Sequence, residues 1–500
     1  MNRLDATRID YHDVAVIGGG VAGISIAELI ARKTDLSVKL IDGAPEFGTG
    51  ASGRLEGWFH TGALYSAVDD GQTFINCVNS LEDLINLYSD YFGDRCNVGL
   101  EPGRSDVHVP AYDVDHQADS PRWFRGSPIY YVQPGLDSPE MRSTRLQNDR
   151  VLLEIERQRV FNRLEAAFGQ SHDWRGPDGS CRAPLLADIE SSEARDCSLR
   201  ADVPALRELC DRYDRSFDCE PSAYDILKSS DITIDTATVM RDLLASALSR
   251  GVDVQPSMAI ESLVLDSYGP LRVKSLLCRD ARNRSVHVKA GVFIFAVGAG
   301  FDEFLQQLNV RVRVKKHKSS MVVASPALSE VNFARMSMNP QHHFNHMVQV
   351  GCAGGREYRY SMIANSSYAE ADSDRADEVK SIDHLMDSAE RYFGRETLYG
   401  RELFGYSCMK TEFLSDVEVK RRYSYWIESD PAANYICVLP GKFSFFPTVA
   451  YQTLLRVNAM LDPAESVGAK VFAPNADAVR DAREFVADHY PLRVLSATDG

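Results

Sequence analysis

One stretch near the N-terminus, residues 12–42 (HDVAVIGGGVAGISIAELIARKTDLSVKLID), constrains the fold more than any other part of the chain. It includes Val14–Ile17, a short apolar run that is typical of a buried parallel strand. Three glycines and an apolar face at helical spacing follow, and a second strand-like run, Val38–Ile41, ends on Asp42. This order predicts a strand, a tight turn, a helix and a second strand, which together form a dinucleotide-binding unit.

Each residue type in this turn has a physical role. Gly18 allows the tight turn, Gly20 lets a pyrophosphate approach the backbone, and Gly23 allows the helix and the strand to pack closely. The helix N-terminus offers N–H groups and the positive end of its dipole to the phosphates. Asp42 can accept hydrogen bonds from ribose hydroxyls. The alternative is a glycine-rich turn in an α/β protein that binds no ligand.

The composition excludes several classes of partner. The chain has 500 residues, of which 44% are hydrophobic and 25% charged, as in ordinary globular proteins. Its net charge of −16 argues against binding to nucleic acid or to anionic membrane surfaces. Residues 311–320 (RVRVKKHKSS) are a basic exception, and they form either a strand with a solvated basic face or an anion site.

The sequence carries no signal for export or for a membrane span. Residues 1–13 contain no apolar core of a secretory signal, and no apolar run approaches the roughly 20 residues that cross a bilayer. The 10 cysteines are scattered from Cys77 to Cys437 without a CxxC pair, which indicates neither a zinc site nor a disulfide framework. We therefore expect a cytoplasmic protein without a bound metal.

A second glycine-ended strand lies far along the chain. Residues 292–297 form a fully apolar run that Gly298 and Gly300 follow, and such glycines let the backbone approach a bound dinucleotide. The N-terminal part of the chain and the part that contains this second strand are therefore expected to build one nucleotide-binding domain. The expected division is 1–96 and 231–310 for this domain, 97–230 for a helical and loop insertion, 311–430 for a substrate domain whose strands roof the cofactor, and 431–500 for a C-terminal cofactor-binding segment and helix.

Residues 48–66 (GTGASGRLEGWFHTGALYS) indicate which dinucleotide binds. They contain the pattern S-x-R-x-x-x-x-x-H-x-G, and a tyrosine follows three residues later. This stretch resembles the FAD-dependent glycerol-3-phosphate dehydrogenases and L-2-hydroxyglutarate oxidases of the D-amino-acid-oxidase-like superfamily, in which the pattern runs past the isoalloxazine. The matching residues are Ser52, Arg54, His60, Gly62 and Tyr65.

Two further stretches resemble the same superfamily, in the same order. Residues 292–300 (VFIFAVGAG) are similar to its second FAD signature. Residues 436–454 resemble the segment of glycerol-3-phosphate dehydrogenases that carries a Gly-Lys pair before a helix, and Gly441 and Lys442 occupy that pair. In the family this loop faces the pyrimidine end of the flavin, where a lysine can stabilise the anionic reduced form. The alternative for Lys442 is a surface lysine.

The resemblance implies both a fold class and a cofactor. The fold is expected to be α/β, with a Rossmann-like FAD-binding domain of the glutathione-reductase-like, two-dinucleotide type and an inserted mixed β-sheet substrate domain. The residues expected to bind FAD are Gly18, Gly20, Val21, Ala22, Gly23, Asp42, Gly43, Ser52, Gly53, Arg54, Ile260, Val297, Gly298, Gly441, Lys442 and Phe443.

The sequence departs from the glycerol-3-phosphate dehydrogenases at two positions where that family carries an arginine. Leu64 stands where the family carries an arginine two residues after its H-G-G glycine pair, which helps to bind phosphate. Pro447 stands where the family usually carries another arginine after the Gly-Lys pair. The loss of both cations argues against glycerol phosphate as the substrate.

His60 is the candidate for a direct chemical role, with Lys442 as the second catalytic candidate. FAD takes a hydride from a carbon that bears a hydroxyl or an amine, and the protein must remove the proton of the heteroatom. An imidazole titrates near neutrality and can act as a base or as a hydrogen-bond donor. Two alternatives stay open for His60: a covalent bond to the flavin, as in the similar W-H-x-x-G stretch of dimethylglycine dehydrogenases, and a structural histidine.

Substrate contacts are expected from strands of the roofing sheet. Residues 339–351 (NPQHHFNHMVQVG) alternate along a strand, so His343 faces the opposite side from three other candidates. An arginine in the next strand can bind a substrate carboxylate bidentately. The alternatives are exposure on the far side of the sheet and a metal site, although no carboxylate or cysteine stands at a matching spacing. The expected contacts are His342, Phe344, His346 and Arg359, with Tyr360, Arg421 and Arg422 as further candidates.

Together these residues indicate a flavoprotein, an FAD-dependent dehydrogenase or oxidase that removes a hydride from a C–OH or C–NH carbon of a small anionic substrate. Its electron acceptor would be oxygen, a quinone or a carrier protein. An amine or amino-acid oxidase on the same scaffold stays open, as does a flavoprotein whose FAD is structural and whose insertion serves a protein partner. The aromatic residues that favour the oxidase alternative are Trp58, Phe59, Phe445 and Phe446.

Overall fold

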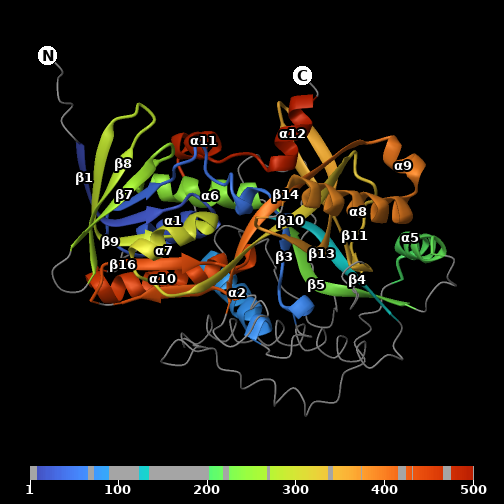
Figure 1. The fold of residues 1–500 in the computed structure, drawn as a ribbon, viewed down its shortest axis with the longest axis horizontal. Coiled ribbons are helices and arrows are strands. Elements are labelled where there is room, and N and C mark those ends of the chain that lie inside the picture. The colour runs from blue at the N-terminus through green and yellow to red at the C-terminus, as the bar shows by residue number, and fades with distance from the viewer. Residues whose placement is uncertain are drawn as a thin grey trace, which may run out of the picture. The chain divides into compact units, whose positions relative to one another are not determined.

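The computed structural model divides into two compact units, each assembled from three segments of the chain (Figure 1). Unit 1 comprises Met1–Arg54, Thr236–Lys316 and Met409–Tyr490. Unit 2 comprises Leu55–Asp235, His317–Cys408 and Pro491–Gly500. The structure describes residues 8–65, 72–88, 123–134, 202–217, 224–266, 271–335, 342–372, 374–414, 424–430, 432–464 and 474–498.

Unit 1 is built on a mixed sheet around β1 (Arg8–Ile17). β2 (Val38–Ile41) and β9 (Ser285–Phe295) pair with β1 in parallel, and β6 (Asp253–Gln255) and β16 (Tyr435–Leu439) extend the parallel part on either side. The run Val14–Ile17 is fully apolar and buried, as a parallel strand covered on both faces requires. The antiparallel strands of this sheet are β7 (Ala259–Asp266), β8 (Arg272–Arg279) and β15 (Trp426–Ser429).

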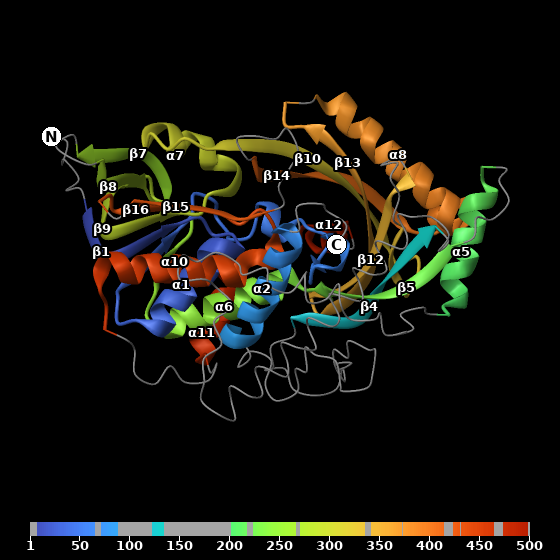
Figure 2. The same ribbon diagram turned by 90° about the horizontal axis from the view of Figure 1, so that it is seen from below.

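Helices cover one face of this sheet, and the β7–β8 hairpin and a short helix lie on the other face (Figure 2). α1 packs against both α6 and α10, and α11 packs against α6. Nearly every residue of α1 is buried because neighbours surround it, so its sequence is apolar on more than one side. The helices are α1 (Val21–Lys33), α6 (Thr236–Ser249), α10 (Phe446–Leu461), α11 (Ala476–Phe485) and, on the opposite face, α7 (Phe301–Gln307).

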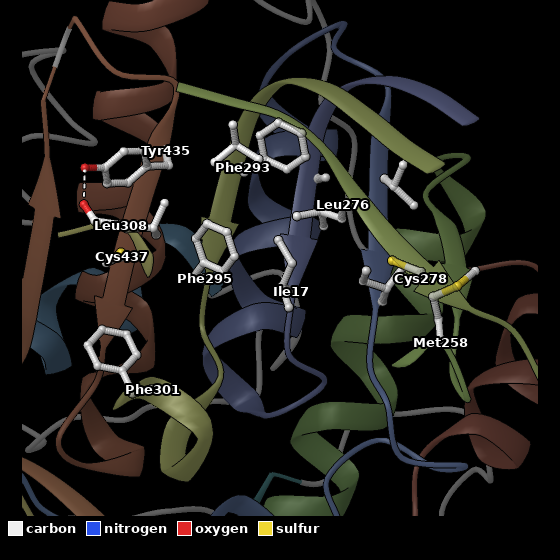
Figure 3. Close-up of a cluster of buried hydrophobic side chains, with 14 of the residues drawn as sticks. Ile17, Met258, Leu276, Cys278, Phe293, Phe295, Phe301, Leu308, Tyr435 and Cys437 are labelled. Carbon is white, nitrogen blue, oxygen red and sulfur yellow. Dashed lines mark hydrogen bonds between the residues drawn. The ribbon is translucent and has the colours of Figure 1, made fainter. Parts of the chain in front are cut away.

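A hydrophobic cluster fills the space between the sheet and the β7–β8 hairpin (Figure 3). Phe293 and Phe295 alternate along β9, so both project into the cluster, where Leu276 of β8 is fully buried. At its border the Tyr435 hydroxyl donates a hydrogen bond to Leu308 O (3.3 Å). This packing fixes β9 beside β1 and β16 beside β9, and with them the loops that follow these strands.

Unit 2 is built on a second sheet with the strand order β14-β10-β13-β12-β11-β4-β5-β3. α8 and α5 pack on one face of it around a core of aromatic and aliphatic side chains. Its strands are β3 (Trp58–Phe59), β4 (Phe124–Pro134), β5 (Tyr224–Ile234), β10 (Arg313–Ser325), β11 (Asn332–Arg335), β12 (Phe344–Ala353), β13 (Arg356–Glu370) and β14 (Glu402–Leu414). Its helices are α2 (Gln72–Tyr88), α5 (Pro204–Arg215), α8 (Arg375–Phe393) and α9 (Arg395–Tyr399), and α12 (Tyr490–Thr498) ends the described chain.

The structure confirms the expected fold class, an α/β protein with mixed sheets. The five-part division of the chain stays a prediction. Most of the expected insertion, residues 97–230, lies outside the described residues, and its described elements, β4, α5 and part of β5, belong to unit 2. Among the described helices, none has the length and apolar character that a membrane crossing needs.

Candidate functional site

The carboxyl ends of the parallel strands meet at one edge of the unit 1 sheet. There the Gly18 N–H donates to Ile41 O at the end of β2 (2.9 Å), and the Ala296 N–H donates to Ile17 O at the end of β1 (2.8 Å). The glycine turn after β1 therefore lies between the loops that follow β2 and β9. In open α/β sheets, ligands bind at such an edge, where neighbouring strands lead off in different directions.

Three glycines of this turn are required by the protein itself. A Cβ atom on Gly18 would lie 2.3 Å from Ala296 O, and the φ of +114° also favours glycine there. A Cβ atom on Gly19 would lie 2.1 Å from the Phe47 ring, and one on Gly23 would lie 1.8 Å from Gly18 O. These glycines therefore allow the close contact between the turn, α1 and the loop after β9.

Gly20 differs, because the described residues leave more space beside it than beside these three glycines. Within 4 Å of a Cβ atom built on Gly20 lies Ser52 Oγ, at 3.2 Å. Gly20 is the N-cap of α1 and supplies no side-chain cap, while the Val21 N–H donates to Ser52 Oγ (3.1 Å). The first turn of α1 thus presents N–H groups and a positive dipole end to this space. These residues fit the pyrophosphate of a dinucleotide.

Asp42 stands beside the glycine turn, at the end of β2. Its carboxylate accepts hydrogen bonds from the Gly19 N–H (2.6 Å) and the Ala44 N–H (2.7 Å), so two backbone donors fix its orientation. Gly43 follows, and a Cβ atom on it would lie 3.6 Å from the backbone of β7, next to Ile260. Asp42, Gly43 and Ile260 are therefore grouped at one end of the edge.

The loops after β9 and β16 reach the same edge, because these two strands pair in parallel. Val297 and Gly298 follow β9, and a Cβ atom on Gly298 would meet no described atom within 4 Å beyond its chain neighbours. Gly441 follows β16 with a φ of +67°, and a Cβ atom there would lie 2.2 Å from Ser424 O. The glycine at position 441 is thus required by close backbone packing, and it brings Lys442 to this edge.

Lys442 leads from this loop into α10. Its N–H donates to Pro440 O (2.7 Å) and its carbonyl accepts from the Phe445 N–H (3.2 Å), so a 3-10 turn, Phe443–Phe445, precedes the helix. α10 in turn packs against α1. Lys442 therefore stands at the same edge of unit 1 as the glycine turn, beyond β9 in the strand order.

Ser52, Gly53 and Arg54 form the last turn of the first segment of unit 1. Ser52 and Gly53 belong to a 3-10 turn, Ala51–Gly53, and a Cβ atom on Gly53 would lie 2.1 Å from Gly48 O. The Arg54 guanidinium lies over the Tyr490 ring, 4.4 Å from its centroid. The structure thus brings the N-terminal FAD candidates of the sequence analysis together in unit 1.

A second polar cluster lies in unit 2 around Asp231 of β5. This fully buried carboxylate accepts hydrogen bonds from Trp58 Nε1 (2.7 Å), the Tyr131 hydroxyl (2.6 Å), the Thr61 N–H (2.9 Å) and the Thr61 hydroxyl (2.8 Å). Burial raises the pKa of Asp231, but the hydrogen bonds from His60, Tyr131 and Thr61, together with the positive charge that His60 carries when it is protonated, outweigh burial and hold this pKa below its usual range. Asp231 is therefore a buried anion.

His60 lies between this anion and Tyr65. Its Nδ1 atom is 3.4 Å from Asp231 Oδ2, and its Nε2 atom is 3.4 Å from the Tyr65 hydroxyl. The centroid of the imidazole lies 4.6 Å from that of Trp58 and 5.0 Å from that of Tyr65. The side chain is 12% exposed. A partly buried imidazole with a carboxylate on one nitrogen is suited to proton transfer.

Two expected substrate contacts, Phe344 and His346, lie in the core of unit 2. Phe344 stacks on Tyr392 of α8, with ring centroids 4.3 Å apart. His346 is fully buried, and its Nδ1 and Nε2 atoms lie 2.9 Å from Val331 O and 2.7 Å from Ser361 Oγ. Burial lowers the pKa of His346 to about 4. Both side chains are thus buried rather than exposed on the far side of the sheet, and a role in binding substrate stays a prediction.

The other expected substrate contacts engage different partners. His342 Nδ1 lies 3.1 Å from the Tyr213 hydroxyl of α5. Arg359 forms an ion pair with Glu330, and 45% of the arginine side chain is exposed. Arg421 and Arg422 lie outside the described residues. Within the described part of the chain, no group of His, Cys, Asp and Glu side chains is arranged to hold a metal ion.

The sequence analysis missed Asp231 and its partner Tyr131. A carboxylate within the strand-like pattern SSDITID is a signal, because a buried charge needs a partner. The contact with His60 was not readable, since His60 precedes Asp231 by 171 residues and no local pattern pairs the two, although the expected boundaries put both in the nucleotide-binding domain.

A family model described as "FAD dependent oxidoreductase" matches residues 13–416 of the chain. No curated protein matches the chain significantly. Solved structures share the fold at low identity. One of them, an FAD dependent oxidoreductase from Pseudomonas aeruginosa, is 13% identical over 96% of this chain and 99% of its own, with a TM-score of 0.52.

Another is a glycine oxidase from Geobacillus kaustophilus, which is 13% identical over 93% of this chain and 99% of its own, with a TM-score of 0.53. A further one is an L-alpha-glycerophosphate oxidase from Mycoplasma pneumoniae with FAD bound, which is 12% identical over 92% of this chain and 97% of its own, with a TM-score of 0.52. At such identities these likenesses show the fold.

Proposed function

This chain belongs to the family of FAD-dependent oxidoreductases, and from this premise we propose that it removes a hydride from a carbon that bears a hydroxyl or an amine group. FAD is the cofactor, and an oxidoreductase of this kind needs a small-molecule electron donor and an electron acceptor. The observation that carries the proposal is the contact between His60 and the buried anion Asp231, which equips unit 2 with an acid–base group.

The residues at the edge of unit 1 fit FAD. The first turn of α1, beside Gly20, would hold the pyrophosphate, and Asp42 would accept hydrogen bonds from the ribose. By resemblance to the Gly-Lys pair of glycerol-3-phosphate dehydrogenases, Lys442 would stabilise the negative charge of the reduced flavin. When bound, FAD accepts the hydride and so supplies the two-electron oxidation.

His60 would take the proton that the substrate loses. Oxidation of C–OH to a carbonyl, or of C–NH to an imine, releases a proton from the oxygen or nitrogen as the hydride leaves. A neutral imidazole can accept this proton, and the carboxylate of Asp231 favours the imidazolium that forms. Tyr65 would orient the ring from the other side.

The proposal covers both hydroxyl and amine donors. Glycine oxidase and L-alpha-glycerophosphate oxidase share this fold, so the fold is compatible with either. Leu64 and Pro447 replace two arginines of the glycerol-3-phosphate dehydrogenases, which argues against a phosphate ester. The expected anionic character of the substrate rests on Arg359, whose ion pair with Glu330 gives it no support.

Anaerobic titration of the purified holoenzyme tests this proposal. Candidate 2-hydroxy acids, 2-amino acids, glycerol phosphate and neutral alcohols are added in turn while the visible absorption of the flavin is recorded. We expect one class to bleach the flavin, and His60→Gln to keep its FAD while bleaching about 100-fold more slowly. A flavin that dithionite reduces but that no donor class bleaches would favour a structural role for FAD.

A further inference from the structure

The carboxylate of Asp231 is restricted to accepting hydrogen bonds. Its side chain is fully buried, and Trp58, Tyr131 and Thr61 all donate to it at 2.6–2.9 Å. Such donors stabilise the charged form, and an ionised carboxylate has acceptor sites but no proton to donate. Each partner of Asp231 must therefore supply the proton of the bond that joins them.

This restriction decides where the proton of His60 lies. The Nδ1 atom faces Asp231 Oδ2 at 3.4 Å, so Nδ1 must carry the hydrogen. A neutral imidazole has one N–H group, which leaves a lone pair on Nε2. Nε2 lies 3.4 Å from the Tyr65 hydroxyl, which must turn its hydrogen away from this lone pair when Nε2 accepts the substrate proton.

From this geometry we infer that Asp231 is the positioning residue of His60: it holds the imidazole proton on Nδ1 and keeps Nε2 as the proton acceptor. The inference rests on the proposed function in that it makes Nε2 the atom that receives the substrate proton. The O–H or N–H bond of the substrate would break and an Nε2–H bond would form, while the C–H bond breaks, the carbonyl or imine forms, and bound FAD would supply the acceptor for the hydride. The resulting imidazolium faces the Asp231 carboxylate across Nδ1.

A purely structural role is the competing explanation. Asp231 of β5 accepts hydrogen bonds from β3, β4 and the loop after β3, and so connects these segments to β5. These hydrogen bonds are shorter than the contact between Asp231 and His60. A readout of the proton on His60 separates the two roles, because a structural tie would leave the tautomer unspecified. Tyr131→Phe is the matched control, since it removes one donor to the same carboxylate but leaves its charge.

The experiment is nitrogen-15 NMR of the holoenzyme labelled at histidine, with the His60 signals assigned by their loss in His60→Gln. In the unaltered protein at neutral pH we expect the Nδ1–H tautomer of His60. In Asp231→Asn we expect the Nε2–H tautomer, because a carboxamide can donate to Nδ1. Tyr131→Phe should keep the Nδ1–H tautomer and lose thermal stability.

Turnover gives the second readout. Asp231→Asn should lower kcat by about tenfold or more with KM nearly unchanged, and Asp231→Glu should restore part of it because it restores the charge. An Nε2–H tautomer in the unaltered protein would overturn the inference, as would an unchanged tautomer in Asp231→Asn. If the tautomers behave as expected but His60→Gln turns over at the normal rate, the proposed acid–base role fails while the positioning role stands. The NMR measurement on the unaltered protein tests the inference even if the Asp231 variants fail to fold.

Discussion

The glycine turn of unit 1 and the Asp231 cluster of unit 2 are built in opposite ways. The turn depends on side chains that are missing, within the short stretch from Gly18 to Gly23. The cluster depends on side chains that are present, and the donors to Asp231 come from residues 100 to 173 positions away. A site made of missing side chains can therefore be read from a short stretch of sequence, whereas a site made of distant hydrogen bonds cannot.

The largest effect, a loss of FAD binding, is expected from a charged substitution at Gly20. Gly20→Glu places a carboxylate where the pyrophosphate would lie, and like charges repel, so we expect complete loss of FAD with the fold intact. The flavin content and the circular dichroism spectrum of the purified variant measure the two properties. Gly20→Ala is the control: it adds a Cβ atom without a charge and should weaken FAD binding less than Gly20→Glu does. A stable yellow Gly20→Glu protein would contradict the cofactor site.

Substitution of the neighbouring Gly23 should instead lower the stability of the fold. Gly23→Ala puts a Cβ atom 1.8 Å from Gly18 O, so the helix and the turn must separate. We expect a loss of about 3 kcal/mol in the free energy of unfolding of the FAD-free protein. Urea unfolding measures this loss. A Gly23→Ala protein as stable as the parent protein would remove the distinction between Gly23 and Gly20.

Asp231 provides a pH-dependent test of the second cluster. Its folded-state pKa lies below the ordinary value of 3.8, so its charge stabilises the fold above that pH, and this contribution is lost as the pH falls through the folded-state pKa. Asp231→Asn should lower the free energy of unfolding by about 2 kcal/mol at neutral pH. The difference from the parent protein in the free energy of unfolding should narrow below about pH 4. A difference in the free energy of unfolding that stays constant with pH would mean that the charge of Asp231 contributes nothing to stability.

The smallest effect is expected at the surface. Arg359 and Glu330 form an exposed ion pair, so Arg359→Ala should change the free energy of unfolding by less than about 1 kcal/mol. If Arg359 nevertheless binds a substrate carboxylate, the KM for anionic donors should rise about tenfold while that for neutral donors stays unchanged. Steady-state kinetics on one donor of each kind decides between the two roles.

The sequence predicted unit 1 better than unit 2 for physical reasons. The turn around Gly18 is local, because strand, glycines and helix follow one another, and their order alone specifies the edge where the ligand binds. In β12 the alternation placed Phe344 and His346 on one face, which the structure shows to be the face under α8. Alternation states that two side chains share a face, but it does not state which face the helices cover.

The interleaving of the two units has a consequence for synthesis on the ribosome. The central strand β1 is made first, yet its neighbour β9 begins only at Ser285, and β16, which pairs with β9, begins at Tyr435. The first segment of unit 1 must therefore wait, with a strand edge unpaired, while most of the chain is translated. We expect the nascent chain to need protection by chaperones during this interval, and to acquire FAD only after nearly the whole chain has been made.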